Sequence, residues 1–271
     1  MESFWAELRK IPPITRFLCG SSLAVTIPVL MNMVSAYRII FVPELVLQKF
    51  ELWRVYTSFF LGSGGINYIF EFVMLYRTAD QLESGSYARN SADFAYQLLI
   101  AAASIIVATR PLSAMIFGRP LLMCLTYLSS ALAPLGAQTS LMGLVTFPVT
   151  YLPYVMVGMD LLMGGPGAAA QSVAGAVVGH FWWWGVWGGT VGGRGGRLEA
   201  FGRAPGWMRS LVGDTAPPPP AGAGPGAGAG ANAGVGAGVH VIPPRRTVAT
   251  GGGSGTSTGY NWGSGQRLGQ N

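Results

Sequence analysis

The chain has 271 residues, of which 50% are hydrophobic and only 10% are charged. Soluble domains carry about 25% charged residues on average, so this composition argues against an ordinary water-soluble enzyme. The formal net charge of +6 is small for this length and does not suggest a nucleic-acid partner. The chain has 2 cysteines in separate apolar runs and 2 histidines, which argues against a disulfide framework or a metal centre, and we expect no cofactor.

Long stretches without charge indicate membrane-spanning helices, because a helix needs roughly 20 mostly apolar residues to cross a bilayer. The gap between Arg119 and Asp160 is long enough for more than one span, and turn residues at 133–139 divide it. A turn at Gly164–Gly167 divides the next gap. We therefore predict an all-α bundle of six spans at approximately Phe17–Met33, Phe59–Tyr76, Phe94–Ala108, Leu112–Leu132, Leu141–Met163 and Ala168–Trp187.

The placement of Lys and Arg predicts the orientation, because cytoplasmic loops carry the excess. With six spans both termini lie on one side, and that side has more Lys and Arg than the other. We therefore expect both termini in the cytosol. Several predicted spans are short for a hydrocarbon core of about 30 Å, and short helices thin the bilayer locally. Thinning lowers the cost of moving polar chain across the membrane.

The C-terminal third differs from the membrane part. From Val191 the chain is rich in Gly, Ala, Pro and Arg, a composition that cannot bury enough apolar surface to fold. We predict a membrane domain at 1–190, a disordered cytosolic linker at 191–259 and a short motif at 260–271.

The terminal segment brings back an aromatic residue and a leucine, Trp262 and Leu268. Such a pair suits short-motif recognition, because Gly263 and Gly265 allow close backbone approach and Arg267 could pair with an acid of a partner. In a glycine-rich tail this pattern is weak when taken alone.

Several motifs follow one another along the chain. They are Ile11-Pro12-Pro13-Ile14-Thr15-Arg16, Leu52-Trp53-Arg54-Val55-Tyr56-Thr57, Leu82-Glu83-Ser84-Gly85, Tyr151-Leu152-Pro153-Tyr154 with Gly158, Gly164-Gly165, and Gly175-Ala176-Val177-Val178-Gly179-His180. Together they resemble the Derlin family of endoplasmic-reticulum rhomboid pseudoproteases, over residues 8–188 and the final ten. The terminal motif resembles the family's SHP box, which engages the AAA unfoldase called valosin-containing protein.

The resemblance gives two further motifs a structural role. Trp53 and Arg54 look like the pair that marks the rhomboid first loop, and by their chemistry the ring would lie at the interface with the guanidinium toward phosphate. We expect the pair to shape the loop and the surrounding membrane. Gly175 and Gly179 form a small-xxx-small face, and we favour packing within the chain over dimerisation.

Proteolysis needs a serine in the fourth span and a histidine base in the sixth, close enough to exchange a proton. Ser129 has no flanking glycine, and Ser172 occupies the position where an active rhomboid would place its histidine. His180 lies about 12 Å further along the helix, at the wrong level. We therefore expect no catalytic residues and no enzymatic activity.

Two acids lie near membrane depth, where an ionisable residue is by default a functional candidate. The family more often has neutral polar residues at the positions of Glu71 and Asp160. Each acid could line a wet cavity that receives substrate, or reach the interface from a helix end. We favour the interface for Asp160 and a substrate cavity for Glu71.

The resemblance implies a non-catalytic component of endoplasmic-reticulum-associated degradation, which aids retrotranslocation of misfolded proteins by thinning the membrane. Its expected partners are membrane lipid, a membrane ubiquitin ligase complex, misfolded substrates and an AAA unfoldase bound by Trp262, Gly263, Gly265, Arg267 and Leu268. The alternatives are an active rhomboid-type protease and a small-solute channel or transporter, although we see no inverted repeat of the kind that transporters show.

Overall fold

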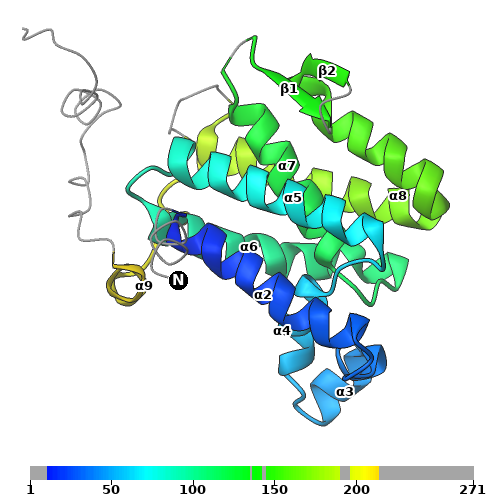
Figure 1. Ribbon diagram of the computed structural model, residues 1–271. Coiled ribbons are helices and arrows are strands. Elements are labelled where there is room, and N and C mark those ends of the chain that lie inside the picture. Colours follow the sequence, from blue (N-terminus) through cyan, green and yellow to red (C-terminus); the bar gives the residue numbers. More distant parts are fainter. Residues whose placement is uncertain (1–10, 135, 142–144, 190–195, 214–271) are drawn as a thin grey trace, which may run out of the picture. The chain divides into compact units, whose positions relative to one another are not determined.

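The computed structural model describes residues 11–134, 136–141, 145–189 and 196–213 (Figure 1). The chain is mostly helical in these ranges, as the sequence predicts. Its α-helices are α2 (Pro13–Leu30), α3 (Pro43–Gln48), α4 (Trp53–Phe60), α5 (Ile66–Gln81), α6 (Ser91–Thr109), α7 (Gly118–Leu132), α8 (Leu152–Trp187) and α9 (Gly206–Val212). Single turns of 3-10 helix lie at Ala36–Arg38, Arg110–Leu112 and Val149–Tyr151, and a π-helical turn lies at Leu82–Ser86.

A remote carboxylate caps the first described helix. Pro13 begins α2 at a position where its missing N–H costs nothing, and Pro12 precedes it. The buried Glu83 accepts hydrogen bonds from Ile14 N at 3.0 Å and from Thr15 N at 2.7 Å, and Thr15 Oγ1 donates a third at 2.8 Å. The carboxylate thus satisfies free amides at the positive end of the helix dipole, and it joins two of the motifs quoted above.

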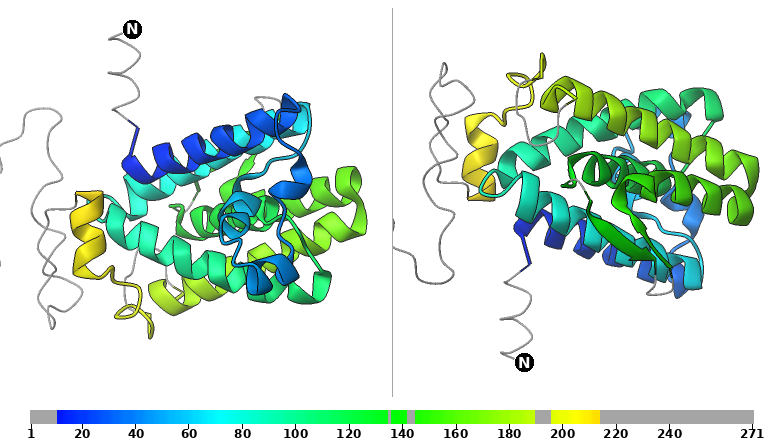
Figure 2. Two further views of the ribbon diagram at one scale, coloured as in Figure 1. Left: turned by 90° about the horizontal axis from the view of Figure 1, so that it is seen from below. Right: turned by 90° about the horizontal axis from the view of Figure 1, so that it is seen from above.

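Helix α7 lies at the centre of the bundle, with α2, α5, α6 and α8 around it (Figure 2). Its sequence is apolar on nearly every face, and Cys124, Leu125 and Leu128 have no exposed surface. A helix that is hydrophobic all round is expected to be surrounded by other helices. Gly118 lets the start of α7 approach α4, because a Cβ there would lie 3.1 Å from the carbonyl oxygen of Leu61.

Helix α8 consists of two halves that run back alongside each other (Figure 2). The reversal occurs at Gly165, whose φ of 74° and ψ of −174° are not helical, and Pro166 follows it. Only glycine adopts such a backbone conformation without strain. The two halves correspond to the predicted fifth and sixth spans, and the turn lies where the sequence places it.

The predicted fifth span begins differently from the sequence expectation. Residues Gln138–Leu141 and Val145–Pro148 form strands β1 and β2, an antiparallel hairpin with Thr139 opposite Phe147, and α8 begins only at Leu152. The predicted second span also differs. Phe59 and Phe60 end α4, and α5 begins after Gly65, whose φ is 67°.

Within the described ranges, three helical segments are long and apolar enough to cross a membrane, namely Pro13–Leu30, Ser91–Leu112 and Val149–Trp187. Helices α5 and α7 are shorter, with 16 and 15 residues. At about 1.5 Å per residue they reach roughly 24 and 22 Å, which is less than a hydrocarbon core of about 30 Å.

Residues 196–213 correct the predicted boundary at 190. This segment, expected to belong to a disordered linker, turns back onto α6 and ends in α9. Asp93 accepts a hydrogen bond from Ala204 N at 2.8 Å and forms an ion pair with Arg209 at 3.1 Å. Gln97 Nε2 donates a hydrogen bond to Gly202 O at 2.8 Å. The high glycine content predicted disorder, but a few residues of this segment anchor it to the bundle. One of them, Met208, is only 5% exposed.

Candidate functional site

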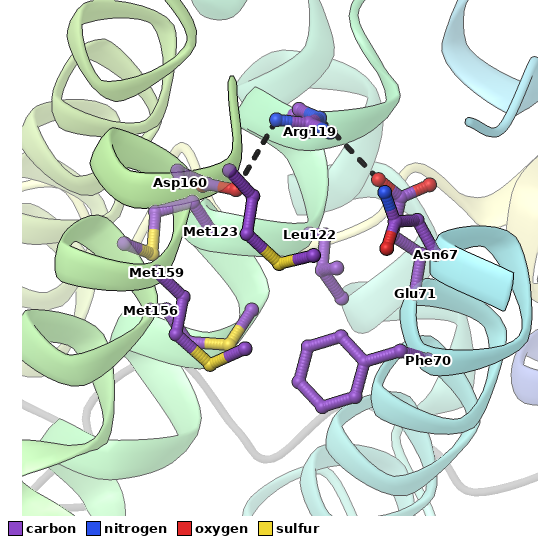
Figure 3. A pocket seen from close by; sticks show the side chains of 10 residues that line it. Asn67, Phe70, Glu71, Arg119, Leu122, Met123, Met156, Met159 and Asp160 are labelled. Carbon is purple, nitrogen blue, oxygen red and sulfur yellow. Dashed lines mark hydrogen bonds and ion pairs between the residues drawn. The ribbon is translucent and has the colours of Figure 1, made fainter. Parts of the chain in front are cut away.

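One arginine joins three helices at one end of a cavity. Arg119, in the first turn of α7, lies between Glu71 of α5 and Asp160 of α8 (Figure 3). Its Nε is 3.3 Å from Glu71 Oε1, and its Nη1 is 3.3 Å from Asp160 Oδ1. The side chains are 26%, 19% and 22% exposed, so the cluster is largely withdrawn from its surroundings.

Two serines hold the carboxylates in place. Ser63, in the loop before α5, donates to Glu71 from its backbone N at 2.9 Å and from its hydroxyl. Arg119 Nη2 donates to the same hydroxyl oxygen at 3.3 Å. On the other side, the buried Ser172 donates its hydroxyl to Asp160. Each charged group therefore has an opposite charge and at least one hydrogen bond, which is what a partly buried ion cluster needs in order to be stable.

The cavity beside this cluster is lined mostly by flexible apolar side chains. Figure 3 shows Phe70 and Asn67 on the α5 side, with methionines from α7 and α8 facing them. The methionines are Met123, Met156, Met159 and Met163. Thioether side chains adapt to partners of different shape, so such a surface suits varied apolar segments better than one fixed ligand.

Glu71 thus lies in a cavity, as the sequence analysis favoured. The Asp160 carboxylate turns toward Arg119 and Ser172, and its expected position at the membrane interface stays a prediction. Sequence reasoning overlooked Arg119 as a site residue, although it lies inside the predicted span Leu112–Leu132. Two acids at membrane depth need a nearby cation, and this requirement could have pointed to Arg119.

Arg54 organises the first loop from the inside. It is 6% exposed, and its guanidinium donates to Tyr37 O at 2.7 Å and Ile40 O at 3.2 Å and pairs with Glu51. The expectation that it points toward lipid phosphate is therefore wrong, because three acceptors of its own loop satisfy its donors. Trp53 is 58% exposed and projects from the same turn.

Gly175 and Gly179 bring the second half of α8 against the backbone of α7. A Cβ at Gly175 would overlap the carbonyl of Pro120, and one at Gly179 would lie 2.9 Å from the carbonyl oxygen of Cys124. Both contacts lie within the chain. Small residues at this spacing let two helix backbones approach closely.

The hydroxyl groups considered for proteolysis do not meet a histidine in the described part of the chain. Ser129 and Ser130 donate to carbonyls of their own helix, those of Thr126 at 3.0 Å and Tyr127 at 2.8 Å. His180, the histidine that lies within the described ranges, places Nδ1 2.7 Å from the Tyr127 hydroxyl. Among these groups the structure shows no pair of a serine hydroxyl and an imidazole in contact.

A sequence model of the Der1-like family matches residues 11–193, which include every residue of the cavity and both glycine contacts. The chain belongs to the Der1-like family. The match also includes the Trp53–Arg54 loop, whereas the terminal motif at 260–271 lies beyond it and outside the described residues.

Curated relatives agree with this assignment. The Der1-like chain is 33% identical over 180 residues to Derlin-1 of Arabidopsis thaliana, which covers 64% of the chain and 65% of that protein. It is 29% identical over 179 residues to Derlin-1.2 of Zea mays, covering 65% and 72% respectively. It is 35% identical over 138 residues to Derlin-1 of Oryza sativa subsp. japonica, covering 50% and 56%. The match thus spans less than two thirds of the Arabidopsis and rice proteins.

Proposed function

We propose that this Der1-like chain is a non-catalytic component of endoplasmic-reticulum-associated degradation, which helps misfolded proteins pass from the lumen to the cytosol. It acts in the endoplasmic-reticulum membrane as a six-span protein with both termini in the cytosol. Its family membership and its apolar helices support this role. We further propose that a membrane ubiquitin ligase complex works beside it.

The observation that carries the proposal is the cavity between α5, α7 and α8. It combines a methionine-rich apolar wall with the ion cluster of Glu71, Arg119 and Asp160 at one end. A passing polypeptide presents both apolar side chains and polar backbone. The cavity has a volume of only about 40 Å³, so we propose that α5 and α8 move apart when a substrate passes. Its lining then offers partners to both, which lowers the cost of placing polar groups at membrane depth.

The short helix α5 supports local thinning of the membrane. It forms one wall of the cavity, has 16 residues and exposes Ile66, Ile69 and Val73, whereas the similarly short α7 is enclosed by the other helices. Lipid beside a short apolar helix thins to match it, at a cost of a fraction of a kcal/mol per Å. Thinning next to the cavity would shorten the apolar path that a substrate crosses.

We assign no catalytic activity to the chain. The hydroxyls of Ser129 and Ser130 are bound to their own helix, and that of Ser172 is bound to Asp160. No described feature favours the protease or the small-solute transporter. The force for transport would come from a partner, and we propose that Trp262, Gly263, Gly265, Arg267 and Leu268 recruit an AAA unfoldase of the valosin-containing protein type.

Co-precipitation of the unfoldase with the full chain, extracted in mild detergent, tests this recruitment. We expect the double substitution Trp262→Ala with Leu268→Ala to reduce the recovered unfoldase about tenfold or more, because aromatic and apolar anchors dominate short-motif binding. The matched control is Trp207→Ala with Leu211→Ala, which removes the same residue types from exposed positions of α9. We expect this control to bind as the wild type does, and equal recovery with both double variants would refute recruitment by the terminal motif.

A further inference from the structure

A second cleft lies between α6 and the second half of α8, and the residues that line it differ from those of the cavity at Glu71. It has about 680 Å³ of open volume, within the range of roughly 300–1,000 Å³ that is typical of ligand sites. Small residues open it, since Ala101 and Gly185 line it where larger side chains would fill it. Exposed apolar side chains, among them Val107 and Phe181, form its rim.

The cleft has two different ends. At one end lie Val107 of α6 and Val177 of α8, and at the other lie Gln97, Gly185 and the 196–213 segment. Gln97 and Val107 are ten residues apart on α6, which corresponds to about 15 Å along the helix. This length is about half of a hydrocarbon core of about 30 Å, so the cleft has the depth of one leaflet.

The polar end is closed by a basic segment. Leu198 and Phe201 line the cleft, and the arginines next to them, Arg197 and Arg203, are exposed. Arg203 pairs with Glu199 at 3.3 Å, whereas no ion pair between described residues includes Arg197. The side chain of Gln97 is hydrogen-bonded to Gly202, Trp182 and Tyr87, and it closes this end of the cleft.

Helix α9 follows directly and exposes Trp207 and Leu211, at 64% and 80%. An exposed tryptophan and leucine on a short helix beside apolar spans are typical of a segment at the membrane interface. This places Arg197 and Arg203 at the level of lipid headgroups.

We propose that this cleft binds one anionic phospholipid of the surrounding bilayer, with an acyl chain along α6 and α8 and the headgroup beside Arg197 and Arg203. The apolar walls match the chain, the one-leaflet depth matches its length, and the basic rim matches the charge. Each arginine near a membrane surface strengthens the attraction for anionic lipid. The site is separate from the cavity at Glu71 and does not depend on the proposed function.

Native mass spectrometry of the full chain, incubated with dioleoylphosphatidylserine or dioleoylphosphatidylcholine, tests the proposal. We expect the wild type to retain one phosphatidylserine in preference to phosphatidylcholine. Ala103→Phe places a ring in the cleft from an exposed rim position and should lower phosphatidylserine retention about tenfold. Ala24→Phe adds the same ring at an exposed position of α2 and should retain lipid as the wild type does.

The headgroup part has its own variant. Arg197→Gln with Arg203→Gln should still retain lipid but lose the preference for phosphatidylserine, whereas Arg110→Gln at the other end of α6 should keep it. Equal retention by wild type and Ala103→Phe, or an unchanged preference in the arginine variant, would overturn the proposal. So would a lipid-free dimer that Ala103→Phe dissociates, because a second copy would then occupy the cleft.

Discussion

Replacing Gly175 with alanine is expected to lower the stability of the bundle by about 2 kcal/mol, or about 4–8 °C in melting temperature. The added methyl group would overlap the carbonyl of Pro120, and backbone cannot move aside as a flexible side chain can. The helices α7 and α8 would have to separate, which loosens the most extensive helix–helix contact among the described elements. Thermal unfolding of the purified protein in detergent measures the effect.

Gly158→Ala is the matched control for this prediction, because it lies on the same helix with open space around it. Alanine there should leave stability unchanged or raise it by up to about 1 kcal/mol, since glycine is the poorer helix former. If both variants had the same melting temperature, the close approach at Gly175 would not be a tight contact, and our account of how α7 and α8 pack would be wrong.

Replacing Arg119 with methionine is expected to cost about 3 kcal/mol, because it leaves two partly buried carboxylates without a cation. Glu71 and Asp160 would then repel each other across the cavity, and the contacts that join α5 to α8 through α7 would weaken. Melting temperature and the steady-state level of the protein in cells should both fall.

Charge compensation distinguishes this mechanism from lost packing. The triple variant Arg119→Met, Glu71→Gln, Asp160→Asn removes all three charges and should recover most of the stability, since neutral amides still accept the hydrogen bonds of Ser63 and Ser172. Arg110→Met, at an exposed position, should behave as the wild type does. A single Arg119→Met variant as stable as Arg110→Met would show that the ion cluster does not stabilise the fold.

The sequence predicted the location of the helices because a membrane imposes long uncharged stretches that can be read directly. It did not predict the hairpin before α8. The mainly polar β1 overlaps the turn expected at 133–139, β2 lies in the uncharged run counted as the fifth span, and their pairing depends on contacts that local sequence does not specify. It also missed the break before α5, although Gly62-Ser63-Gly64-Gly65 is a turn signal, and Gly65 takes a positive φ there.

The candidate site was predictable in part. Glu71 stood out because an acid at membrane depth needs an explanation, but its partner Arg119 is 48 residues away and lies on another predicted span. In the sequence, Ser172 is of interest only because it stands where an active rhomboid has a histidine. In the structure its hydroxyl donates a hydrogen bond to Asp160. Pairings of this kind depend on how helices pack, which local sequence does not specify.

The central claim is that this Der1-like chain moves misfolded proteins to the cytosol without cutting them, and the half-life of a misfolded lumenal glycoprotein tests it most directly. In cells that lack the endogenous protein, we expect the wild-type chain to restore rapid, proteasome-dependent loss of the intact substrate. Substitution of Ser129 and Ser130 by alanine should preserve this activity, because their hydroxyls bond only to their own helix, and Trp262→Ala with Leu268→Ala should abolish it. A wild-type chain that leaves the substrate stable, or a serine variant that accumulates substrate while its own level is normal, would contradict the account.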